Sequence, residues 1–179
     1  LNKELIRMGH DVRILTLSHN NYSSKNDNVY YIKSFGINVY PNMRATVSFN
    51  DKYLKEILEW GPDIIHSKCE FFTFVFAKRI SKKLNIPIVH TYHTMYEHYT
   101  EYVLKNKTVG KKLASAFSKG IAKKVDIMIA PTEKVRESLK KYGIKKEIEV
   151  VPTGINLDKF KIKMPEEEKI KLKMSLGLD

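Results

Sequence analysis

The chain is poor in cysteine, glycine and proline: its 179 residues include one cysteine, Cys69, with 8 glycines and 6 prolines. A single thiol excludes a disulfide framework and a four-cysteine zinc site, and it makes a reducing, cytosolic setting the expected one. No apolar stretch approaches the roughly 18 residues that a transmembrane helix needs, and the first residues lack the apolar core of a signal peptide. The apolar content of 42% argues against a disordered chain.

Acidic residues are the other scarce class. The 20 aspartates and glutamates stand against 32 lysines and arginines, which gives a formal net charge of +12. Such a charge suits nucleic acid, an anionic membrane surface or a small phosphorylated ligand as partner. It equally suits a protein whose surplus lysines only maintain solubility, so charge alone does not choose among these.

Short apolar segments alternate with helical patterns along the chain. Strands are predicted at residues 12–17 and 29–32, and four more, separated by helical stretches, at residues 64–66, 86–92, 125–130 and 148–151. Strands of this kind, apolar throughout and joined by helices, are typical of a parallel sheet that is buried on both faces and has right-handed crossovers. The sequence therefore predicts a Rossmann-like α/β fold with a doubly wound parallel sheet.

Helix boundaries are marked by capping residues and glycines. Thr132 fits the cap of a helix that Gly143 ends, and residues 50–61 and 109–124 predict two further helices. The polar residues 20–28 show neither helical nor strand periodicity, so a loop is predicted there.

The two ends of the chain carry different signals. Residues 1–9 resemble the second half of an amphipathic helix, so we expect a strand and a turn to precede residue 1. After the last predicted strand, Pro152-Thr153-Gly154 breaks the pattern. We therefore expect residues 1–152 to form one domain, and residues 153–179 to form a hinge and the first piece of a second domain.

Polar residues follow each of the last four predicted strands. In an open parallel sheet, ligands bind beyond the carboxyl ends of the strands, so these residues are the candidate substrate-binding set. They are His66, Glu70, His93, Tyr96, Thr132, Glu133 and Gly154. Glu70 also fits the first turn of a helix, where a carboxylate interacts favourably with the helix dipole. Four polar strand ends at one edge of a sheet predict a cleft.

His90 and His93 lie three residues apart around the end of a predicted strand. A metal site requires three or four ligands at one point, and two histidines in this arrangement are poorly placed to share an ion, so no metal is predicted. His90 lies inside the strand and is expected to be a hydrogen-bonded core residue. His93 lies just beyond the strand and is expected in the pocket, where a neutral imidazole can hydrogen-bond to a substrate hydroxyl.

The predicted helix 109–124 has a basic face. Lys112, Lys119 and Lys123 fall within about 40° of one another on the helical wheel. Leu113, Phe117 and Ile121 cluster on the other side. A basic helix face near aromatic residues fits the surface of an anionic membrane, and a solvated helix packed on the sheet is the alternative.

Four motifs, in order along the chain, carry a resemblance to a known family. They are Pro62-Asp63-Ile64-Ile65-His66, the segment 86–96 with its Tyr92-His93-Thr94, Ala130-Pro131-Thr132-Glu133, and Val151-Pro152-Thr153-Gly154-Ile155-Asn156. The chain resembles the amino-terminal domain of the family 4 glycosyltransferases, which are retaining enzymes of GT-B architecture. The tyrosine-rich run 90–102 most resembles the bacterial diacylglycerol glucosyltransferases of that family.

The resemblance implies a reaction and its partners. Two Rossmann-like domains hold a nucleotide-sugar between them, and the amino-terminal domain receives the acceptor. The implied donor is a UDP-sugar, the implied acceptor is a membrane lipid such as diacylglycerol, and no permanently bound cofactor is expected. In this family the histidine of the Tyr-His-Thr motif contacts the donor sugar, which assigns the catalytic role to His93.

The resemblance also implies a location, a peripheral one on the cytoplasmic face of the membrane, without nucleic acid as a partner. The chain departs from the family pattern in lacking the glycine-rich loop after the family's first strand and a spaced pair of glutamates. We therefore expect an acceptor domain that is inactive alone. Two alternatives stay open: a basic α/β module that binds nucleic acid, and another GT-B enzyme that uses a sugar nucleotide.

Overall fold

The computed structural model describes residues 1–37, 43–94, 107–155, 157, 161 and 164–178. Its largest sheet has four strands in the order β6-β7-β8-β9, and every neighbouring pair is parallel. The strands are β6 (Ile65–Ser67), β7 (Ile88–Thr91), β8 (Ile127–Ala130) and β9 (Ile148–Val150). They overlap the last four strands that the sequence predicts.

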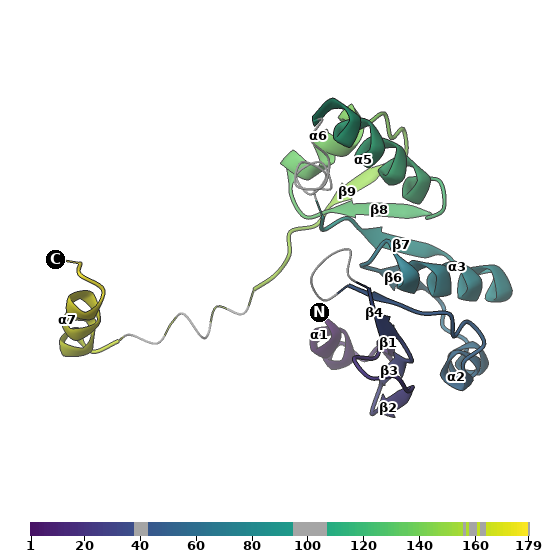
Figure 1. Cartoon of the computed structure of the whole chain (residues 1–179), viewed down its shortest axis with the longest axis horizontal. Coiled ribbons are helices and arrows are strands. Elements are labelled where there is room, and N and C mark those ends of the chain that lie inside the picture. Colours follow the sequence, from purple (N-terminus) through teal and green to yellow (C-terminus); the bar gives the residue numbers. More distant parts are fainter. Residues whose placement is uncertain (38–42, 95–106, 156, 158–160, 162–163, 179) are drawn as a thin grey trace.

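Helices alternate with these strands along the chain. The helix α3 (Phe72–Leu84) follows β6, α5 (Lys107–Ala122) follows β7, and α6 (Glu133–Lys141) follows β8. Because consecutive parallel strands need a crossover, each helix carries the chain back to the edge where the next strand begins. This arrangement, visible in Figure 1, confirms the predicted α/β fold with a parallel sheet.

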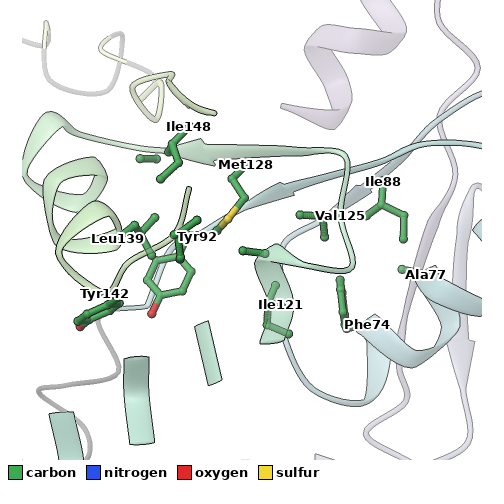
Figure 2. Packing of buried hydrophobic residues seen from close by; sticks show 13 residues of the cluster. Phe74, Ala77, Ile88, Tyr92, Ile121, Val125, Met128, Leu139, Tyr142 and Ile148 are labelled. Carbon is green, nitrogen blue, oxygen red and sulfur yellow. The ribbon is translucent and has the colours of Figure 1, made fainter. Parts of the chain in front are cut away.

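The larger hydrophobic core lies between this sheet and its helices (Figure 2). Side chains alternate across a strand, and Ile88, Met128 and Ile148 share one face, where they pack with buried residues of α3, α5 and α6. Residues of the other parity lie outside this cluster, and Ile127 is 45% exposed. In the described part of the chain, the buried side chains of these three helices therefore cover one face of the sheet.

A second sheet is built from the first third of the chain. The strand β1 (Ile14–Leu17) pairs in parallel with β3 (Val29–Ile32), and β2 (Ser24–Asn26) adds an antiparallel edge. The helix α2 (Lys52–Trp60) packs with α3 over this sheet in a second core. Two short strands, β4 (Phe35–Gly36) and β5 (Arg44–Ala45), pair with each other.

The expected loop at residues 20–28 is wrong, because β2 lies within it. Asn26 pairs with Val29, so the turn contains only Asp27 and Asn28. Asp27 has a φ of 50°, a left-handed conformation that aspartate tolerates better than most residues. The sequence pattern did not predict β2 because this strand lies at the edge of the sheet. Its Lys25 and Asn26 are exposed, so this strand needs no apolar residues there.

The predicted helix ends are confirmed at several points. The Asp51 side chain accepts a hydrogen bond from the Tyr53 amide at the start of α2, and Gly61 ends that helix in the left-handed conformation. The helix α1 (Asn2–Arg7) matches the helical pattern of the first residues. The helix α7 (Glu166–Ser175) has no buried residue and lies apart from both sheets in Figure 1. None of the described helices is long and apolar enough to cross a membrane.

Candidate functional site

The carboxyl ends of β6 to β9 lie at one edge of the sheet, because all four strands are parallel. His66 lies in β6 near its end, His93 lies two residues beyond β7, and Thr132 lies two residues beyond β8. Gly154 follows β9 in an exposed segment. The structure thus brings the predicted strand-end residues to a common edge, as the sequence argument requires.

His93 is exposed, yet the backbone that presents it is anchored on two sides. Nε2 of His66 lies 2.7 Å from Oγ1 of Thr91, which ties β6 to the end of β7. The next residue, Tyr92, is fully buried, and its hydroxyl lies 2.7 Å from Oγ of Ser118 on α5. Both contacts lie directly before His93, so the strand end is fixed before a substrate arrives.

A buried ionisable pair lies one step further back on β7. Nε2 of His90 is 3.4 Å from Oε1 of Glu70, and their side chains are 0% and 3% exposed. The ring of Phe74 meets the His90 ring edge-on, at 5.8 Å between centroids. His90 is buried, as expected, but neither of its ring nitrogens has a hydrogen-bond partner among the described residues, so the expected hydrogen bond is wrong. Glu70 precedes α3 instead of lying in its first turn.

The two histidines nearest the strand ends favour the neutral state. Partial burial lowers the pKa of His66, and the cation of Lys68 lowers it further. Partial desolvation of the ring is also the main reason why the pKa of His93 is lowered, although the side chain as a whole is exposed; Lys68 and His90 add to that effect, and Glu70 opposes it. Near neutral pH both rings therefore offer one N–H donor and one nitrogen acceptor, the combination that a hydroxyl group can satisfy.

The remaining predicted site residues are less closely connected. Thr132 caps α6, where its hydroxyl accepts a hydrogen bond from the Val135 amide at 3.3 Å. Glu133 is exposed and pairs with Arg136 at 2.5 Å. Among the residues that the structure describes, no side chain lies within 4 Å of a Cβ built on Gly154. Tyr96 lies outside the described residues.

All three predicted lysines are solvent-exposed; Lys112 and Lys119 lie on α5, and Lys123 lies in the turn directly after that helix. The apolar side differs from the prediction: Ile121 is buried, whereas Leu113 is 53% exposed. The buried stripe of α5 passes through Ala114, Ser118 and Ile121, which are 2%, 0% and 4% exposed. Leu113 lies about 100° around the helix from Ala114, so it falls at the flank of this stripe and stays exposed.

Sequence reasoning missed Lys68 and Ser118. Lys68 immediately follows β6, so the rule that selected His66 and Glu70 applies to it as well. Ser118 is fully buried on α5, between the buried Ala114 and Ile121. A hydroxyl on the apolar stripe of a helix was the available signal, because such a group needs a hydrogen-bond partner inside the protein.

The Tyr92 hydroxyl supplies that partner, and its removal should weaken the fold. Because Ser118 donates to the Ala114 carbonyl at 2.7 Å, the Tyr92 hydroxyl donates to Ser118. Tyr92→Phe is expected to lower the free energy of unfolding by about 1 kcal/mol, measured by urea denaturation. Tyr22→Phe, at a position that is 61% exposed, is the matched control with no measurable loss expected. Equal losses in the two variants would refute a stabilising role for this bond.

The sequence profile of Glycosyltransferase Family 4 matches residues 1–159. Two curated relatives are alpha-monoglucosyldiacylglycerol synthases. The one from Streptococcus pneumoniae is 33% identical over 180 residues, which cover 99% of this chain and 41% of the relative. The one from Acholeplasma laidlawii is 30% identical over 189 residues, which cover 99% of this chain and 47% of the relative. The chain thus spans less than half the length of these relatives.

A solved structure shares the fold. Sucrose-phosphate synthase from Thermosynechococcus elongatus matches with a TM-score of 0.50 at 14% identity, over 98% of this chain and 91% of that chain. This likeness confirms the expected Rossmann-like, GT-B type of fold and carries nothing further. The resemblance that the four motifs indicated is confirmed by the profile match, and the chain belongs to Glycosyltransferase Family 4.

Proposed function

We propose that the full-length protein is a retaining glycosyltransferase that moves a sugar from a nucleotide-sugar to a membrane lipid. The family match over residues 1–159 carries this proposal. The names of the two relatives favour glucose as the sugar and diacylglycerol as the acceptor. The donor is then UDP-glucose, which agrees with the UDP-sugar that the motif resemblance implies.

The strand-end geometry suits the part of this reaction that we assign to the chain. Glycosyl transfer builds positive charge on the sugar ring and negative charge on the departing diphosphate, so the sugar must be held in one orientation. A neutral His93 on an anchored backbone binds and orients a sugar hydroxyl. We assign the remaining contacts with substrate to His66, Tyr96, Thr132, Glu133 and Gly154. The predicted contact with Glu70 is not proposed again, because its side chain is 3% exposed.

The proposed domain organisation divides the chain after residue 152. Residues 1–152 form the acceptor domain, and residues 153–179 form the hinge and the first piece of the domain that holds most of the nucleotide. Two observations support this division. The segment 151–155 is exposed after the last strand of the sheet, and α7 contributes no buried side chain.

A transfer assay tests the function. The full-length protein is incubated with radiolabelled UDP-glucose and vesicles that contain diacylglycerol, and label is expected in the organic-solvent extract as a glucosylated lipid. Label found on water-soluble acceptors would contradict the proposed lipid acceptor and favour a soluble glycan. Absence of transfer from any sugar nucleotide, together with tight binding of duplex DNA, would contradict the proposed enzyme and favour a module that binds nucleic acid.

We propose the basic face formed by Lys112 and Lys119 of α5 and by Lys123 in the turn after it as a membrane contact on the cytoplasmic side. Each lysine near an anionic bilayer contributes about 1 kcal/mol. The exposed side chains of Val109 and Leu113 add apolar surface at the start of this helix. Because α5 begins after the carboxyl end of β7, that end of the helix lies toward the strand ends where the acceptor is needed.

Neutralising this face should weaken membrane binding. The triple variant Lys112→Gln, Lys119→Gln, Lys123→Gln is expected to bind vesicles containing phosphatidylglycerol about 100-fold less tightly, measured by co-sedimentation at low salt. The control removes the same charge from the exposed Lys52, Lys55 and Lys82 on α2 and α3. We expect little change in the control. An equal loss in both triple variants would show that net charge, rather than this face, determines binding.

A further inference from the structure

Burying the pair formed by Glu70 and His90 costs free energy of folding. Its two side chains are 3% and 0% exposed and meet at 3.4 Å, and the Phe74 ring packs against His90. Taking ionisable groups out of water costs several kcal/mol, and apolar residues of the same volume often give equal or greater stability. Stability alone therefore does not explain why a carboxyl group and an imidazole occupy these positions.

The position of the pair points to the strand ends. His90 lies on β7, three residues before His93, and Glu70 lies between β6 and α3. Ser67 is the register partner of His90, so His90 points to the covered face of the sheet, and His66 and Thr91 meet on the other face. The pair therefore joins the ends of β6 and β7 on the covered face of the sheet, and the contact between His66 and Thr91 joins them on the opposite face.

The electrostatic influence of the pair reaches His93. The carboxylate of Glu70 raises the pKa of His93, and His90 and Lys68 lower it, with burial as the largest lowering effect. Among the described residues, the titratable groups that act on His93 come from the loop before α3, through Lys68 and Glu70, and from β7, through His90. One contact that α5 makes on the neighbouring Tyr92 is the hydroxyl of Ser118, which carries no charge.

We propose that Glu70 and His90 together are positioning residues for His93: they hold the end of β7 from the buried side and balance the charge beneath the ring, so that a neutral imidazole faces the substrate. This inference rests on the proposed role of His93 in sugar transfer. Neither residue is assigned a contact with the reacting atoms. Each acts through His93, and the two side chains act on the His93 ring in opposite directions, so removing one should disturb His93 in the direction opposite to removing the other.

The first test is a titration of His93 in the full-length protein, labelled with ¹³C in the histidine rings and assigned with His93→Gln. Glu70→Gln removes a nearby negative charge at nearly constant volume, so the pKa of His93 should fall further. His90→Gln removes an imidazole that lowers this pKa, so the pKa should rise. The control is Glu56→Gln on α2, whose carboxylate pairs with Lys25 at 3.0 Å and which should leave the titration unchanged.

Opposite shifts are a signature that general loosening of the fold does not produce. Shifts of equal sign, or no shift in either folded variant, would overturn the inference. This measurement needs no activity, so it decides the role of the pair even if the full-length protein transfers no sugar.

The second test uses a variant designed to fold. In Glu70→Met/His90→Phe an apolar pair replaces the ionisable one, which should preserve or raise the unfolding temperature. We expect its kcat for sugar transfer to fall at least about 10-fold, because His93 loses its support from the covered face of the sheet. A stable variant with unchanged kcat would overturn the inference and leave the proposed function intact.

Discussion

Replacing His93 by alanine is expected to lower the kcat of the full-length protein by about 100-fold, the scale of loss when a reacting group is no longer held in place. The side chain is exposed, so its removal leaves no cavity in the core. The midpoint of thermal unfolding should therefore stay within a few degrees of the original value. The measurement is a comparison of transfer rates at saturating donor with unfolding curves of the same samples.

Two further variants sharpen this prediction. His10→Ala removes an exposed histidine from the turn between α1 and β1, far along the chain from the strand ends, and should leave turnover unchanged. His93→Gln keeps one donor and one acceptor, and it should retain more activity than the alanine variant. Turnover that survives His93→Ala intact would remove this residue from the site.

The pH dependence of turnover follows from the same residue. The pKa of His93 is lowered, so the ring is neutral at pH 7 and gains a proton only as the pH falls below the usual range of histidine. Activity that needs the neutral ring should be constant above that range and fall on acidification. Stability has the same sign: the unfolded chain binds the proton more tightly, so stability is full above about pH 6.5 and declines as the pH falls through the lowered pKa.

Replacing Phe74 by alanine should have the largest effect on stability, a loss of about 3–5 kcal/mol in the free energy of unfolding. The ring is 3% exposed in the larger core and packs edge-on against His90. Truncation leaves a cavity that the surrounding helix and sheet cannot close fully. Urea denaturation of the 179-residue chain, followed by circular dichroism, measures the loss.

Phe71 supplies the matched control, three residues earlier in the same segment. Its ring is 42% exposed and stacks on Phe117 with 5.7 Å between centroids. Because water already reaches this ring, Phe71→Ala should cost about 1 kcal/mol, near the centre of the range for single substitutions. Losses of equal size at the two positions would contradict the assignment of Phe74 to the core.

Much of the fold was predictable because short apolar strands and capped helices are local signals. The strands β6 to β9 were found on this basis, and their parallel order followed from the intervening helices. The edge strand β2 was not, because an exposed edge does not demand apolar residues. The position of each strand end followed from topology, so His66, His93 and Thr132 were brought to one edge as expected.

Contacts across the sheet were beyond the reach of sequence patterns. The meeting of Glu70 with His90 depends on the register that pairs Ser67 with His90, and no local pattern sets that register. The sequence therefore predicted Glu70 as a substrate-binding or first-turn helix residue and His90 as a hydrogen-bonded core residue, without their contact. The exposure of Leu113 likewise depends on which stripe of α5 faces the sheet, which is a property of the packed elements.

The anchoring of Thr91 and Tyr92 has a consequence for ligand affinity. Ordering a flexible backbone costs about 1–2 kcal/mol of conformational entropy for each residue, and a mobile loop incurs this cost when it binds. At the end of β7 folding has already restricted those torsions. In the role proposed for His93, ligand binding is therefore opposed mainly by the ligand's own loss of motion and by desolvation, and a larger share of each contact formed there appears as binding free energy.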